Sequence, residues 1–171
     1  GVSKGTLYLY FDSKESLFKA VVREALLPNL TAAETMAKAS AGPISDTLAA
    51  ILRNLARAVA ETNIGAIPKL IIAEAGSFPE LARFYHDEVI ARAMTLISGM
   101  VARGVVRGEF RPVDPRHVVY LAIAPILVAA LWRETFERHG APRLDPLALI
   151  DQHIEILLRG LAAQPPAERE P

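Results

Sequence analysis

The sequence predicts an all-α protein. Apolar residues recur at intervals of three and four along most of the chain, and this spacing places side chains on one face of a helix. No stretch shows the apolar–polar alternation that is typical of a half-buried strand. Ser, Asp and Pro stand where the periodic stretches begin and Gly where several of them end, as is usual at helix termini. Hydrophobic residues make up 51% of the 171 residues, which is ample for a helical core.

The N-terminal region predicts two helices separated by a tight corner. Ser3 is placed to cap a short helix from Lys4 to Phe11. Ser13 follows a break in the pattern and caps a second helix, which runs from Lys14 to about Leu27. Pro28 has no backbone donor, so this helix either kinks there or ends and restarts with Pro28 in its first turn.

Three further helices are predicted before residue 108. The first is amphipathic and follows the stop signal Ala41-Gly42-Pro43, and a short apolar helix follows from Ile67 to Ala75. Ser77 is predicted to cap the next helix, with Glu80 completing a capping box. That helix runs without interruption from Pro79 to about Arg107, where a glycine ends it.

The last two helices are predicted to form a dimer interface. Each opens on Asp-Pro, because aspartate caps a helix and proline fits its first turn. The first of them, 114–139, is apolar almost all round between Val118 and Trp132, so it must be buried on more than one side. We therefore predict a homodimer in which this helix and the last one, 146–163, build a four-helix interface.

Composition narrows the class of protein. The apolar stretch from Val118 to Trp132 is shorter than the roughly 20 residues that span a bilayer, and no signal peptide is visible, so we expect a cytoplasmic protein without a membrane partner. Lys and Arg number 19 and balance 19 Asp and Glu, which gives no overall attraction to nucleic acid. The absence of cysteine excludes disulfides, thiolate metal sites and a cysteine nucleophile.

The opening run GVSKGTLYLYFDSKESLFKAVV resembles the end of the helix-turn-helix of TetR-family transcriptional regulators. The family pattern is a recognition helix, a Tyr-x-Tyr/His-Phe corner and a Ser-Lys-Glu-x-Leu start to the next helix. The resemblance implies a TetR-like fold, a dimer through the last two long helices, and two more helices ahead of Gly1. The expected segments are a partial helix-turn-helix (1–12), a connecting helix (13–41), a ligand-binding and dimerisation domain (42–163) and a disordered tail (164–171).

The predicted DNA contacts lie in this first run. Side-chain hydroxyls would donate to phosphate oxygens, and a lysine at a helix N-terminus would add positive charge there. In the family pattern the start of the recognition helix faces the major groove and reads base edges. The residues are Thr6, Tyr8, Tyr10 and Lys14 toward phosphates, and Ser3, Lys4 and Gly5 toward bases. The alternative is a solvated helix that binds nothing.

A ligand pocket is predicted among the middle helices, with plain core packing as the alternative. Methionine and tryptophan side chains suit an adaptable apolar pocket. Glu74 would orient a ligand, or else it points to solvent or pairs with Lys69 or Arg92. The candidate lining residues are Leu52, Leu55, Ile71, Glu74, Phe84, Met94, Ile97, Met100, Ile126 and Trp132.

No constellation of residues indicates catalysis. The four histidines are isolated, and there is no nucleophile elbow, phosphate loop or dinucleotide fingerprint, so we expect no metal, no cofactor and no enzymatic activity. The leading hypothesis is a ligand-responsive DNA-binding transcriptional regulator, a homodimeric repressor that a small apolar effector releases from a double-stranded DNA operator. The alternative, which the zero net charge favours, is an all-helical ligand-binding or interaction protein without DNA binding.

Overall fold

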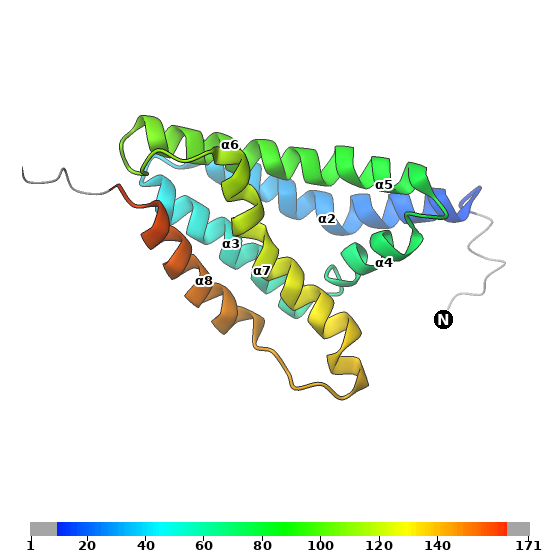
Figure 1. Cartoon of the computed structure of the whole chain (residues 1–171). Coiled ribbons are helices and arrows are strands. Elements are labelled where there is room, and N and C mark those ends of the chain that lie inside the picture. The colour runs from blue at the N-terminus through cyan, green and yellow to red at the C-terminus, as the bar shows by residue number, and fades with distance from the viewer. Residues whose placement is uncertain (1–9, 164–171) are drawn as a thin grey trace, which may run out of the picture.

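The computed structural model describes residues 10–163, and in this range one helix follows another with no strand between them (Figure 1). The predicted all-α fold is confirmed. The elements are α2 (Lys14–Ala39), α3 (Ile44–Glu61), α4 (Ala66–Glu74), α5 (Pro79–Tyr85), a π-helical turn η1 (His86–Ile90), α6 (Ala91–Val106), α7 (Pro115–Thr135), a 3-10 turn η2 (Glu137–His139) and α8 (Pro146–Leu161).

Helix α2 begins as predicted but does not end at Pro28. The Ser13 hydroxyl accepts from the Ser16 backbone N–H at 3.0 Å, and the Ser16 hydroxyl accepts from the Ser13 N–H at 3.1 Å, which forms a capping box. The helix then continues through Pro28 to Ala39. Side chains on both sides of the proline, such as Leu26 and Met36, pack against the core. This tertiary packing outweighs the cost of the missing hydrogen bond.

Helices α5 and α6 form one long rod beside α2 (Figure 1). A π-helical turn lies between them. The prediction of an uninterrupted helix was wrong at His86–Ile90. The predicted Ser77 cap was also wrong, because Phe78 is the N-cap residue of α5 and no side chain caps it. The Ser77 N–H instead donates to the Glu74 carbonyl at 3.0 Å, so Ser77 belongs to the turn that closes α4.

Helices α7 and α8 start at the predicted caps. The Asp114 carboxylate accepts from the Arg116 N–H at 2.9 Å, and the Asp145 carboxylate accepts from the Leu147 N–H at 3.0 Å. Helix α7 ends at Thr135, somewhat earlier than predicted, and a single 3-10 turn completes the path to Gly140. Gly140 has φ +93°, a left-handed conformation that suits glycine after a helix end.

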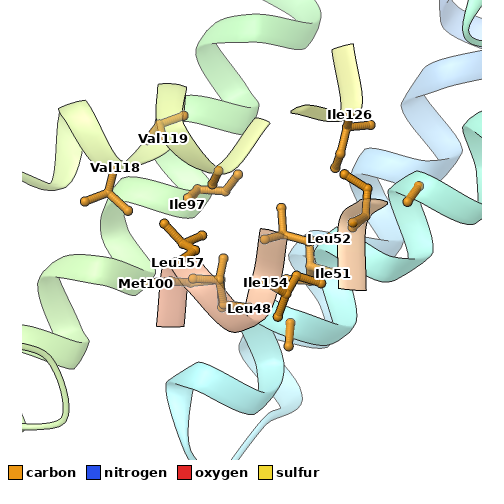
Figure 2. Close-up of a cluster of buried hydrophobic side chains, with 14 of the residues drawn as sticks. Leu48, Ile51, Leu52, Ile97, Met100, Val118, Val119, Ile126, Ile154 and Leu157 are labelled. Carbon is orange, nitrogen blue, oxygen red and sulfur yellow. The ribbon is translucent and has the colours of Figure 1, made fainter. Parts of the chain in front are cut away.

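The buried hydrophobic residues form two clusters. The larger lies where α3, α6, α7 and α8 meet, and it includes Leu48, Leu52 and Met100 (Figure 2). The smaller contains Val22, Ile67, Ile71 and Leu81 and joins α2, α4 and α5. Ala25 and Leu26 of α2 contact both clusters. The first half of α2 is therefore packed directly against the domain that follows it.

Two helical stretches, Pro79–Val106 and Pro115–His139, are long and apolar enough to cross a membrane by length and composition alone. The second of these contains the apolar stretch Val118 to Trp132, which by itself is too short to span a bilayer. The helical stretch is longer because residues on both sides of it are helical too. Both pack against other helices of the bundle, as core helices of non-membrane proteins also do.

Candidate functional site

Most of the predicted DNA-contacting residues lie outside the described part of the chain. These are Ser3, Lys4, Gly5, Thr6 and Tyr8. Tyr10 is described, and the residue is 80% exposed. Lys14 is also described, and it lies in the first turn of α2.

The Lys14 ammonium makes contacts that the sequence did not suggest. Its Nζ lies 2.9 Å from Oε2 of Glu74, the last residue of α4. It also lies 5.5 Å from the ring centroid of Phe18 and 5.2 Å from that of Phe78, within the range of cation–π attraction. Through these contacts Lys14 connects α2 to the end of α4 and the start of α5. About half of the side chain remains exposed, so solvent reaches the ammonium.

Two more cations extend this contact along α2. The Lys19 ammonium lies 5.6 Å and the Arg23 guanidinium 4.9 Å from the ring centroid of Phe84 on α5. Lys19 also pairs with Glu15 at 2.6 Å. Sequence reasoning missed these residues, because the rings that receive the cations are far from α2 in the chain.

The partner of Glu74 is neither of the two cations that the sequence suggested, and its role toward a ligand stays a prediction. Glu74 binds Lys14, and neither of the two cations expected for it is engaged there. Lys69 donates to the Glu134 backbone carbonyl at 2.6 Å, and Arg92 forms a bidentate pair with Glu34 at 3.0 Å. Both expected pairings were therefore wrong, since tertiary contacts outside α4 supply the partners.

The predicted pocket residues do not come together as one lining. Leu52, Ile97, Met100 and Ile126 are buried in the larger cluster, with Leu55 and Met94 packed against it. Ile71 and Phe84 belong to the smaller cluster, and Glu74 is half-buried at the end of α4. Trp132 stands apart, where its indole N–H donates to the Pro142 carbonyl at 3.0 Å and its ring packs 5.1 Å from Phe136.

Two concave features of the described chain lie away from most of these residues. One is a cavity of about 30 Å³ beside the start of α3, lined by Ser40, Thr47, Met100 and Arg103 among others. That volume is enough for a water molecule. The other is an open groove of about 860 Å³ between α3 and α8, whose lining includes Arg53, Asp151 and Glu155. Its lining mixes these charged side chains with apolar ones and so differs from the mostly apolar pocket that the sequence predicts.

A buried charged centre, which the sequence did not single out, joins α3, α4 and α7. The Glu134 carboxylate is only 2% exposed and pairs with Arg133 at 3.3 Å and with Arg138. The Arg133 guanidinium donates to the carbonyls of Val59 and Thr62 at 2.6 and 2.7 Å. These carbonyls belong to the C-terminal end of α3, where acceptors lack partners within the helix. The centre thus anchors α3 and, through Lys69, α4 to α7.

An apolar surface runs along α7 and α8. Tyr120 and Leu121 are each 61% exposed, Val128 is 56% exposed, and Ile156 on α8 is 64% exposed. Another face of each helix is buried, through residues such as Ala122 on α7 and Ile154 on α8. The two helices are in contact, and several large apolar side chains exposed on neighbouring helices are a feature of protein–protein contacts.

Two protein-family models match the chain. The model described as "Tetracyclin repressor-like, C-terminal domain" matches residues 38–146, and the model described as "Bacterial regulatory proteins, tetR family" matches residues 1–21. The sequence has no significant match among curated proteins.

Several solved structures share the fold. A TetR-family transcriptional regulator from Mesorhizobium loti superposes with a TM-score of 0.70 at 22% identity, over 95% of this chain and 82% of that one. The Bacillus subtilis transcriptional regulator FadR, in complex with stearoyl-CoA, gives 0.72 at 21% identity over 94% and 83%. A regulatory protein of the TetR family from Rhodococcus RHA1 gives 0.70 at 18% identity over 96% and 82%.

Proposed function

The chain belongs to the TetR family of bacterial regulatory proteins, and we propose that this ligand-responsive transcriptional regulator is a repressor, released from its operator by a small apolar effector. The main observation that supports this proposal is that α2 links the DNA-binding end to the core of the regulatory domain. Helix α2 starts directly after the predicted recognition helix, and its first half packs against both apolar clusters of the regulatory domain. A change in those clusters would therefore be transmitted to the DNA-binding end.

DNA binding is proposed for the residues of the opening run, with Tyr10 and Lys14 on phosphates. Two recognition helices of a dimer would enter successive major grooves about 34–36 Å apart on a palindromic site. The test is a gel shift of the full-length protein with the DNA upstream of its own gene. Absence of binding at low salt would refute the repressor and favour the alternative of a helical ligand-binding protein without DNA binding, which the zero net charge supports.

The phosphate role of Lys14 has a sharper test. Lys14→Ala should weaken binding to specific and random duplexes alike and lower the slope of log affinity against log salt by about one. Lys38 lies in the last turn of the same helix and provides the matched control. If Lys38→Ala and Lys14→Ala behave identically, the proposed contact is wrong.

The effector is proposed to be apolar and to bind among the residues of the larger cluster. Met94 and Met100 are unbranched side chains that can rearrange to admit a ligand. The FadR structure was solved with stearoyl-CoA, so a long-chain acyl thioester is the first class to test here. Binding should raise the melting temperature and weaken the gel shift, because the ligand favours a conformation that does not bind DNA. A ligand that raises the melting temperature and leaves DNA affinity unchanged would contradict the release mechanism.

The homodimer is proposed to form through α7 and α8, as the exposed apolar surface supports. A cytoplasmic location and the absence of catalysis go with this role. Size-exclusion chromatography with light scattering measures the mass directly. A stable monomer at micromolar concentration would refute the dimer.

A further inference from the structure

We propose that Glu74 lowers the DNA affinity of this protein by competing with operator phosphates for the Lys14 ammonium. The inference rests on the proposed role of Lys14 in DNA binding and adds a second, intramolecular partner for the same charge. Glu74 thereby becomes a residue of the regulatory domain that sets affinity without touching DNA.

The competition follows from how the ammonium is surrounded. Lys14 has three N–H donors, and one of them is directed at the Glu74 carboxylate at 2.9 Å. The rings of Phe18 and Phe78 lie within 5.5 Å of Nζ and accept none of these hydrogens strongly. The side chain is 49% exposed, so a phosphate can approach it from solvent.

A phosphate that approaches Lys14 meets two obstacles. The ammonium is already partly neutralised by Glu74, and the incoming phosphate is repelled by that carboxylate. Binding therefore either places two anions beside one cation or breaks the Lys14–Glu74 pair. Both routes make the phosphate contact weaker than it would be for an unpaired lysine.

The competing carboxylate is held in place by the fold. Glu74 ends α4, and Ile67 and Ile71 of that helix are buried in the smaller cluster. Lys69 near the start of α4 donates to the Glu134 carbonyl on α7. Glu74 is therefore fixed relative to the regulatory domain, whereas Lys14 lies at the start of the helix that leads from the DNA-binding end.

The test measures affinity for two 30-bp duplexes, one from the upstream DNA and one of random sequence, with the full-length protein. Glu74→Gln keeps the shape of the side chain and removes its charge. It should tighten binding to both duplexes by about two- to fivefold per protomer, as expected from the strength of an exposed ion pair. Glu74→Asp, which keeps the charge on a shorter side chain, should give a smaller gain. Thermal melting confirms that each variant is folded.

Two controls separate competition from a general change of charge. Glu80 on α5 is an exposed carboxylate that pairs with Arg83 at 3.1 Å, so Glu80→Gln removes the same charge without freeing Lys14. This variant should bind like the wild type. In a Lys14→Ala background, Glu74→Gln should have no effect, because the group for which it competes is gone.

Each other outcome overturns the inference. An equal gain from Glu74→Gln and Glu80→Gln, or a gain that persists in the Lys14→Ala background, would show a long-range charge effect. Weaker binding of Glu74→Gln would show that Glu74 positions Lys14 for DNA rather than withholding it. If the wild type binds and Glu74→Gln binds equally, the inference alone fails. If no variant binds either duplex at low salt, the proposed function fails and the inference with it.

Discussion

Gly104 on α6 is predicted to be intolerant of even one methyl group. A Cβ atom at this position would lie 2.2 Å from Cδ2 and 2.6 Å from Cε2 of Phe110. Favourable carbon contacts are at about 3.5–4.0 Å, so the ring would have to move by more than about 1 Å. Phe110 is 3% exposed, and its N–H donates to the Gly104 carbonyl at 3.1 Å, which leaves the ring little room to retreat.

The magnitude follows from two opposing terms. Overpacking of a core costs about 1–3 kcal/mol, and full displacement of a buried phenylalanine costs about 3–5 kcal/mol. Alanine gains about 1 kcal/mol over glycine inside a helix. Because the Phe110 ring would be displaced only in part, the packing cost lies between these two figures, at about 2–4 kcal/mol. After the helix-propensity gain of about 1 kcal/mol is subtracted, we expect Gly104→Ala to lower the free energy of unfolding by about 1–3 kcal/mol. Arg111, the residue after Phe110, donates its N–H to the Leu161 carbonyl of α8 at 2.8 Å. Displacement of Phe110 would therefore also disturb the end of α8, which is one of the helices of the predicted dimer interface.

Gly99 on the same helix provides the matched control. Its Cβ would meet nothing closer than the flexible Arg103 guanidinium at 3.9 Å. Gly99→Ala should therefore raise the free energy of unfolding by about 0.5–1 kcal/mol through helix propensity. Urea unfolding followed by circular dichroism measures both variants. Equal stabilisation by the two substitutions would refute the packing of Phe110 on Gly104, as would a Gly104→Ala penalty that is undiminished in a Phe110→Leu background.

Three further predictions concern the dimer face, the buried charged centre and a helix cap. Leu121→Glu should shift the protein from dimer to monomer in light scattering without lowering its helicity, whereas an unchanged mass would exclude this face. Arg133→Met should destabilise the fold by about 2–4 kcal/mol in urea, because it leaves the carbonyls at the end of α3 without their donor and removes one of the two cations that pair with buried Glu134; a change below about 0.5 kcal/mol would contradict this role. Hydrogen bonds from the Arg116 side chain and backbone lower the pKa of Asp114 from 3.8 to about 2. Since the folded-state pKa is below the unfolded value, this cap stabilises the fold above about pH 4 and is lost as the pH falls toward about 2. An NMR titration of the Asp114 carboxyl that gives an ordinary midpoint would refute the cap.

Local sequence predicted the features that depend on neighbouring residues. Ser13, Asp114 and Asp145 cap helices as expected, because capping needs only a short acceptor side chain and the next turn of backbone. The same criterion predicted a cap at Ser77, and that prediction was wrong, because the Ser77 backbone belongs to the turn that closes α4. The continuation of α2 through Pro28 was left open by the sequence, because it depends on packing against other helices.

The sequence by itself determined the all-helical class, the positions of most helix starts and the family, because helical periodicity, caps and the opening motif are all written in consecutive residues. Only the tertiary structure decided which distant groups meet. Glu109, from the loop before α7, accepts from the Ile44 and Ser45 N–H groups at 2.8 and 2.6 Å and caps α3. Glu74 likewise reaches Lys14 across the α2–α4 contact at 2.9 Å. Such pairings depend on how helices pack, and the spacing of residues along the chain carries no information about partners so far apart.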